Sequence, residues 1–188
     1  WVYTTTNSFG TTQRRFYSYQ NTGSSTVLWV GLTSSMKFAV EMRSSNGTND
    51  IQINGTTTVS LNTWYHVAVV RTGTTVYLFV NGAQDGTAGS MNQNIASASA
   101  FNIGAYNNGV SDWWGGFITN LRVVKGTALY TANFTPSSVP LTNITNTSLL
   151  LAVLSSGAAT IDISSNAFTV TNNGTVTYSS TVTPYPFY

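Results

Sequence analysis

The stretch "NTWYHVAVVRTGTTVYLFVNGAQDGTA", residues 62–88, decides the fold of this chain. Apolar side chains occupy both alternating faces of residues 64–71 and of residues 75–80, a pattern typical of strands that are covered on both sides. The small turn Thr72-Gly73-Thr74 separates the two runs, and Asn81-Gly82 follows the second. Because glycine and asparagine accept the positive φ angles of tight turns, the stretch predicts a hairpin in the middle of a sheet.

The same stretch contains the only histidine of the chain, His66. It lies within an apolar strand and has no acidic residue near it in the sequence. A general base needs a partner that orients it and room for a substrate. We therefore predict a structural histidine, hydrogen-bonded to a neighbour.

Short segments rich in β-branched and aromatic residues recur along the rest of the chain. The predicted strands are Val27–Leu32, Lys37–Arg43, Asp50–Ile53, Trp64–Arg71, Thr75–Val80, Ala100–Ile103, Gly116–Val124, Leu149–Leu154, Ala167–Thr171 and Thr175–Tyr178. Further turns are predicted at Asn46-Gly47, Asn54-Gly55, Asn108-Gly109 and Asn173-Gly174, and one short helical turn at Gly126–Tyr130. The sequence thus predicts an all-β protein, a two-sheet antiparallel sandwich of the jelly-roll kind.

Composition narrows the class of protein. Charged residues make up 6% of the chain, against roughly 25% in ordinary soluble domains. A surface of Ser, Thr and Asn suits a protein that works outside cells, at high salt or packed against copies of itself. The net charge of +2 and the single basic pair Arg14-Arg15 argue against nucleic-acid binding. There is no cysteine and no apolar run long enough to span a membrane.

Two stretches resemble laminin-G-like, concanavalin A-like jelly-roll domains. Residues 64–88 resemble the central hairpin of that family, which has Trp-x-His-Val-Ala, an Arg, a small turn and a strand that ends in Val-Asn-Gly. Residues 101–141 are similar to its later part, and the matching positions are Ile103-Gly104, Gly116, Ile118, Leu121-Arg122, Lys125-Gly126, Tyr130-Thr131, Phe134 and Pro136. The variant most similar to this chain is repeated in virion and tail-fibre proteins of marine bacteriophages and in bacterial surface proteins. The resemblance covers about residues 1–150 and implies a position on an extracellular or virion surface.

The resemblance also implies missing strands. "WVYTTT", residues 1–6, is similar to a strand that lies some way into the family domain, whereas "TSLLLAVL", residues 147–154, resembles the opening of that domain. The later residues Asp162–Asn166 and Phe168–Val170 continue this likeness. Residues 145–183 either begin a following repeat or replace the missing strands, and we favour replacement because it avoids open sheet edges. We expect one domain over residues 1–183 and a Pro/aromatic tail or linker at 184–188.

Catalysis is not expected from this sequence. Glycosidases need two carboxyl groups that face one cleft. The only glutamate is Glu41, and its neighbours at alternate positions on the strand are Ala39 and Arg43. No Gly-x-Ser-x-Gly nucleophile motif is present. We therefore predict that the protein is not an enzyme.

An aromatic cluster in an Asn/Gly-rich stretch indicates a ligand site instead. Sugars stack on aromatic faces, and their hydroxyls bond to amides and carboxylates. The candidate binding residues are Tyr106, Asn107, Asn108, Asp112, Trp113 and Trp114. Adjacent strand residues face opposite ways, so at most one of the two tryptophans is expected at the surface. The competing interpretation is that both are core residues and that the asparagines only shape turns.

A Ca²⁺ site is the one metal site that the sequence suggests. Loops rich in Asn and Asp can supply the six to eight oxygen ligands that this ion takes. The candidate ligands are Asn49, Asp50 and Asp112. Turn formation explains the same residues without a metal.

These observations predict a non-catalytic binding or adhesion module of an extracellular or virion surface protein. Its partner would be a glycan or a host cell-surface receptor, and it would act as a homo-oligomer or within a larger assembly. The alternative is a purely architectural subunit of a fibre, filament or capsid shell that contacts only copies of itself. A binder keeps an exposed aromatic and polar rim in the assembled state, whereas a building block buries that rim.

Overall fold

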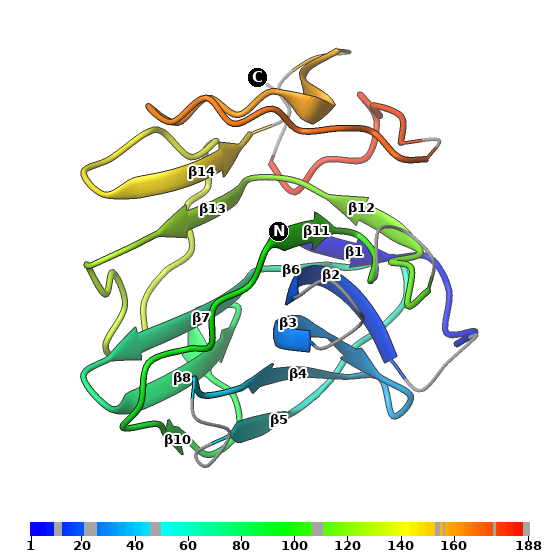
Figure 1. The fold of residues 1–188 in the computed structure, drawn as a ribbon. Coiled ribbons are helices and arrows are strands. Elements are labelled where there is room, and N and C mark those ends of the chain that lie inside the picture. The colour runs from blue at the N-terminus through cyan, green and yellow to red at the C-terminus, as the bar shows by residue number, and fades with distance from the viewer. Residues whose placement is uncertain are drawn as a thin grey trace.

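All strand pairs in the described part of the chain are antiparallel, and the strands form a two-sheet sandwich (Figure 1). The computed structural model describes residues 1–9, 13–20, 26–45, 50–106, 111–152, 155, 157–174 and 176–185. The predicted all-β, antiparallel sandwich class is confirmed. No helix among these residues has the length and apolar character of a membrane span.

One layer is a five-stranded sheet. Its order is β11 (Ala100–Ile103), β2 (Gln13–Gln20), β3 (Thr26–Thr33), β4 (Lys37–Met42) and β5 (Ile51–Thr58). In its register Val30 pairs with Val40, and Trp29 with Glu41. Because alternate residues face opposite sides, the valines point to the core and the Trp29–Glu41 pair lies on the outer face.

The facing layer contains the hairpin of the opening stretch, made of β7 (Val67–Thr72) and β8 (Thr75–Val80). Thr72 pairs with Thr75, and Gly73 between them has a φ of 56°. Asn81 and Gly82 follow with φ values of 51° and 83°. The two predicted turns of this stretch are therefore confirmed. The short strands β9 (Ala83–Gln84) and β10 (Gly89–Ser90) pair with β8.

Two predicted strands are each divided in the structure. The first is divided at His66 into β6 (Trp64–Tyr65), which pairs with β1 (Val2–Thr4), and β7. The second is divided into β12 (Gly116–Ile118), which also pairs with β1, and β13 (Leu121–Val124), which pairs with β14 (Thr147–Leu151). Asn120, which lies between β12 and β13, has a φ of 52°, so the backbone turns there.

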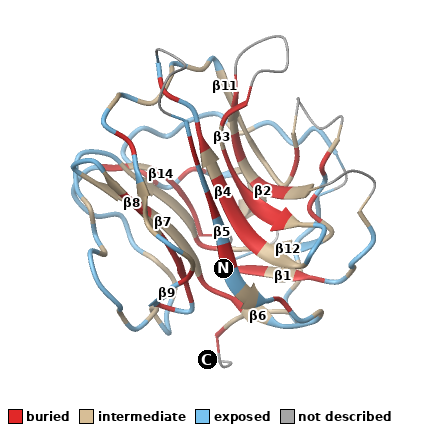
Figure 2. Cartoon of the chain, turned by 90° about the horizontal axis from the view of Figure 1, so that it is seen from below, coloured by how far each residue is buried: buried red, intermediate tan, exposed pale blue. Residues whose placement is uncertain are grey.

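The core fills the space between the two layers. It contains Val30, Phe38 and Val40 from the five-stranded sheet and Val76 and Leu78 from β8. Buried segments follow the middle of the five-stranded sheet in Figure 2. Each of these five side chains is less than a tenth exposed, and burying each one contributes about 1.5–3 kcal/mol.

Sequence reasoning did not predict the strand Gln13–Gln20, and the reason is visible in its side chains. Its residues Arg15, Ser18 and Gln20 are polar and yet buried. The loop after β11 covers this face, because Ser18 Oγ donates to the carbonyl of Ala105 and Gly104 N donates to the carbonyl of Phe16. A polar strand beneath a distant loop does not show the apolar alternation that marks a strand.

The turn predicted at Asn54-Gly55 is wrong, because both residues lie inside β5. The missing side chain of Gly55 makes room for the carboxylate of Asp85, which the Cβ of any other residue would strike. Asp85 Oδ1 accepts bonds from the backbone N–H and the hydroxyl of both Thr56 and Thr57. The glycine therefore serves side-chain packing rather than chain reversal.

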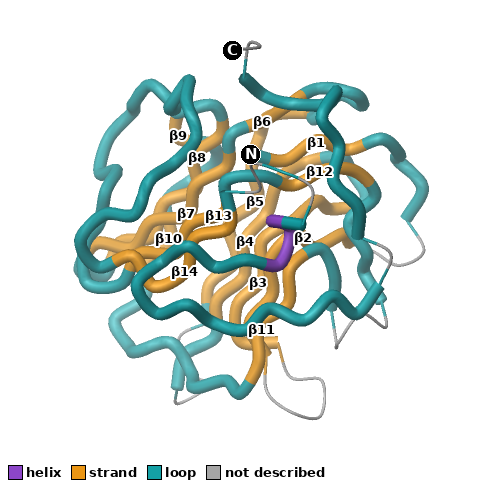
Figure 3. The backbone as a smooth tube through the Cα atoms, turned by 90° about the horizontal axis from the view of Figure 1, so that it is seen from above, coloured by secondary structure: helices purple, strands orange, loops and turns teal. Residues whose placement is uncertain are grey.

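The segment after β14 also differs from prediction. It is almost entirely loop in Figure 3, with one 3₁₀ turn, η2 (Ala158–Thr160). Residues 167–171 form a single bridge, Ile161 to Thr169, instead of a strand, and 176–178 form none. No helical turn forms at Gly126–Tyr130. The predicted turns at 46–47 and 108–109 lie outside the described residues.

Candidate functional site

Tyr106 and Asp112 lie close together, as the sequence predicts, but an internal arginine lies between them. The carboxylate of Asp112 forms a buried ion pair with Arg15, with Oδ2 2.9 Å from Nε. The Arg15 guanidinium lies 4.1 Å from the ring centroid of Tyr106 and 5.3 Å from that of Trp29. Asp112 and Tyr106 therefore serve to hold Arg15 over the outer face of the five-stranded sheet.

The tandem tryptophans face opposite ways. Trp114 is 8% exposed, its ring centroid is 5.4 Å from that of Phe16, and its Nε1 donates to the carbonyl of Tyr3. Trp113 is 58% exposed, the largest fraction for any aromatic residue in the described part of the chain. Its carbonyl accepts a hydrogen bond of 3.0 Å from Arg14 Nη1. Of this pair only one indole is exposed, as expected, although both residues lie in the loop before β12 rather than in a strand.

The Ca²⁺ candidates are only partly described. Asn49, Asn107 and Asn108 lie outside the described residues. Asp50 Oδ1 accepts the backbone N–H of Ser44 at 2.9 Å. The positive charge of Arg15 beside Asp112 opposes a second cation there. The described residues contain no cluster of three or more His, Asp or Glu side chains. The Ca²⁺ site stays a prediction that rests mainly on Asn49 and Asp50.

His66 lies between β6 and β7 and is 8% exposed. Its ring makes edge contacts with Trp1, Phe134 and Tyr130, with centroids 5.2, 5.4 and 6.4 Å away. Burial lowers its pKa to about 4. The predicted side-chain hydrogen bond is not found, since Nδ1 has no described partner. The ring is held by packing instead, which is a structural role.

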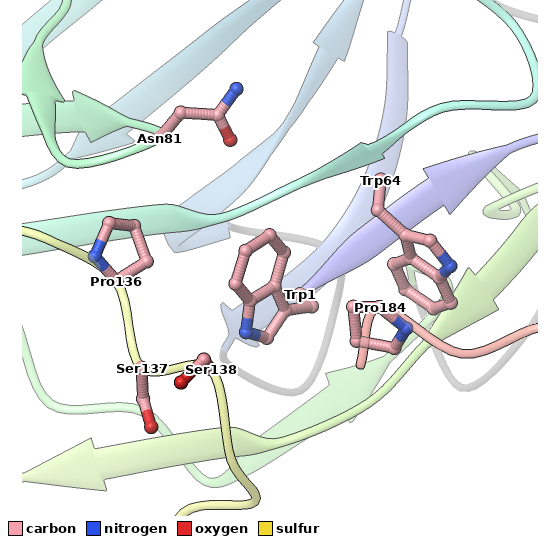
Figure 4. A pocket seen from close by; sticks show the side chains of 7 residues that line it. All are labelled: Trp1, Trp64, Asn81, Pro136, Ser137, Ser138 and Pro184. Carbon is pink, nitrogen blue, oxygen red and sulfur yellow. The ribbon is translucent and has the colours of Figure 1, made fainter. Parts of the chain in front are cut away.

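Sequence reasoning missed an open cleft, shown in Figure 4, that lies away from the tandem tryptophans. It has a volume of about 370 Å³ and is lined by Trp1, Trp64, Asn81, Pro136, Ser137, Ser138 and Pro184. These residues come from the beginnings of β1 and β6, the turn after β8 and two later loops. Trp1 and Trp64 were read only as strand residues, because no local pattern shows that the fold places them side by side.

Comparisons with known proteins agree with this fold. A family model described as the concanavalin A-like lectin/glucanases superfamily matches residues 1–133, and the chain belongs to this superfamily. No curated protein sequence matches the chain.

Among solved structures, the chain is similar to a candidate carbohydrate-binding protein from Bacteroides ovatus, with 15% sequence identity and a TM-score of 0.55. The match covers 82% of this chain and 44% of that one, so this chain spans less than half the length of that protein. At this identity the likeness shows the fold alone.

Proposed function

We propose that this protein is a non-catalytic carbohydrate-binding module and that the exposed indole of Trp113 is its contact platform. The observation that carries the proposal is that this indole is 58% exposed while its backbone is fixed on both sides. The carbonyl of Asp112 accepts the N–H of Arg15, and Trp114 N donates to the carbonyl of Gly104. Because the backbone is already fixed, only the indole side chain has to be ordered when a sugar ring stacks on it.

The described carboxylates are engaged in bonds within the protein, which favours a binding function over catalysis. Glu41 accepts bonds from Trp29 Nε1 and Arg43 Nε, both at 3.0 Å, and Asp112 is paired with Arg15. The remaining described carboxylates, Asp50, Asp85 and Asp162, accept backbone N–H groups. Glycoside hydrolysis needs one carboxyl group free to give a proton and a second that acts on the sugar or on water.

The setting that we propose is an adhesion module of an extracellular or virion surface protein. The 6% charged residues and the superfamily support it, and the similar protein from Bacteroides ovatus is itself described as a candidate carbohydrate-binding protein. The partner would be a glycan or a host receptor that carries one. Asn107 and Asn108 precede Trp113 by six and five positions in the sequence and would supply amides to the sugar hydroxyls.

A glycan array measured with and without Ca²⁺ tests the proposal. We expect a glycan that the parent binds to bind Trp113→Ala at least about tenfold more weakly, because the stacking face is lost. Phe168→Ala is the matched control, since Phe168 is an aromatic side chain 45% exposed on another segment. Equal binding by both variants and the parent would place the site elsewhere.

The architectural alternative is favoured by a different observation. Exposed apolar side chains gather in the C-terminal segment, where Ile161, Ile163 and Val176 are 51%, 46% and 62% exposed. A shell or fibre subunit would bury such residues against a copy of itself. Sedimentation of the parent and of Val176→Ser decides this. A reversible oligomer that the variant loses, together with no glycan binding, would support the architectural role.

A further inference from the structure

The cleft between Trp1 and Trp64 has the chemistry of a second carbohydrate site. Two indole rings and two proline rings supply apolar faces, and Ser138 and Asn81 supply a hydroxyl and an amide, while the hydroxyl of Ser137 is bonded to the backbone of Val139. None of the lining side chains is ionisable, so the cleft suits a neutral ligand. A neutral sugar has one apolar ring face, which matches the rings of the cleft, and a rim of hydroxyls, which matches its polar groups.

The indole walls are fixed by the surrounding structure before any ligand arrives. The Trp64 ring lies 5.3 Å from the ring of Tyr3, and the Trp1 ring is 5.2 Å from that of His66 and 6.3 Å from that of Tyr185. In Figure 4, Trp1 stands between Trp64 and Pro184 on one side and the serines on the other. A sugar that enters therefore meets surfaces that need no rearrangement.

The polar wall is also held in place. Phe134 N donates to the carbonyl of Gly82 at 2.8 Å, which fixes the loop leading to Pro136. Asn81 Oδ1 accepts the N–H of His66 at 2.9 Å. This bond leaves the amide nitrogen of Asn81 as a donor, with no partner among the described residues. The exposed hydroxyl of Ser138 adds a group that can both donate and accept.

We propose that this cleft binds one or two residues of a neutral glycan, with a sugar ring against the indoles and its hydroxyls on Ser138 and Asn81. Its volume of about 370 Å³ is at the lower end of the roughly 300–1,000 Å³ of ligand clefts, which suits a short stretch of sugar. The inference rests on the proposed function for its ligand class, but it names a site separate from Trp113. The module would then contact a glycan chain at two places.

Fluorine NMR of the full chain labelled with 5-fluorotryptophan tests the two sites independently. The chain has five tryptophans, and single Trp→Phe variants assign their resonances. The probes are cellohexaose, laminarihexaose and mannohexaose, with a proline-rich decapeptide as the competing ligand class. Trp29 and Trp114, at 2% and 8% exposed, are internal controls whose resonances should not move.

We expect at least one hexasaccharide to shift the Trp1 and Trp64 resonances in a saturable way. Ser138→Tyr should fill the cleft and weaken that response at least about tenfold while the Trp113 response remains. A response at Trp113 alone overturns the cleft site and leaves the proposed function standing. A response to the decapeptide alone identifies a peptide groove and overturns the carbohydrate assignment. No response to any sugar at any of the five tryptophans contradicts both proposals.

Discussion

Burial holds the pKa of His66 at about 4, well below its ordinary value of 6.5. On acidification, the imidazole of His66 is therefore protonated at a higher pH in the unfolded chain than in the folded one. The contribution of His66 to stability should be full above about pH 6.5 and should be lost, by up to about 3 kcal/mol, as the pH drops toward 4. His66→Gln should cost about 1 kcal/mol at pH 7.5 and should flatten this dependence.

Chemical unfolding of the parent and of His66→Gln at pH 7.5 and pH 4.5 measures the effect. Hydrogen bonds hold the pKa values of Asp85 and Asp162 below their ordinary value, so their contributions disappear only below this window. Burial also lowers the pKa of the Trp1 amine to about 5, and this group adds to the fall in both proteins, so only the difference between parent and variant belongs to His66. Equal pH dependence in the two proteins would contradict the assignment to His66. Ligand binding at the Trp113 platform, which His66 does not contact, should stay within about threefold of the parent, a change of less than 1 kcal/mol.

Gly55 makes a second prediction at the residue scale. Its Cβ position overlaps Asp85 Oδ2, so Gly55→Ala must displace a carboxylate that is tied to two threonines. We expect a loss of about 1–3 kcal/mol in the free energy of unfolding, as for other overpacked sites. Gly174→Ala is the control, because nothing lies within 4 Å of its Cβ position. Equal urea midpoints for the two variants would show that Asp85 moves freely.

The sequence predicts features that depend on neighbouring residues, but it does not predict contacts between residues that only the fold brings together. The expectation that at most one of Trp113 and Trp114 is exposed is confirmed, although its premise of a strand is wrong, because residues 112–115 lie in a loop before β12. The Arg15 partner of Asp112 could not be predicted, because 97 positions of sequence separate the two residues and only the sheet topology joins them. A site built from several segments, such as the Trp1–Trp64 cleft, is invisible to local patterns for the same reason.

At the scale of elements, β14 connects the C-terminal segment to the rest of the fold. Leu149, Leu150 and Leu151 are 3%, 0% and 5% exposed, and β14 pairs along the whole of β13. On its other side, Asp162 Oδ1 accepts the N–H of Leu150 at 2.9 Å, and Ile163 N donates to the carbonyl of Leu150. The sequence predicted this strand from its leucine run, within about three residues at each end.

We propose that residues 145–183 complete one domain with the rest of the chain, and deletion of residues 145–188 tests this. The deletion removes three core leucines, each of which contributes about 1.5–3 kcal/mol, and their sum approaches the total stability of a small domain. The product should be insoluble, or molten by near-UV circular dichroism. A product that unfolds cooperatively at unchanged stability would instead show that the segment starts a separate repeat.

At the scale of the whole molecule, the frequent turn signals and short apolar segments of the sequence predict a β-sandwich, and the structure is one. This fold class does not depend on any particular long-range contact. The turn and β8 were predicted to the residue because both faces of the hairpin are apolar, whereas β7 begins three residues later than predicted, after the break at His66. Asn54-Gly55 and Gln13–Gln20 were misread for one reason. In both places a partner from elsewhere in the chain, Asp85 or the loop after β11, decides what the backbone does.

The pairing of the first strand has a consequence for how the chain acquires its fold. Trp1 N donates to the carbonyl of Thr119, 118 positions later, and β1 lies between β6 and β12. Contacts of such long sequence separation slow folding, because the loop they close must be ordered first. On a ribosome the β7–β8 hairpin can form early. The strand β1 can pair with β6 once that strand has emerged, but its other edge stays open until β12 follows, and an open strand edge invites pairing with another chain.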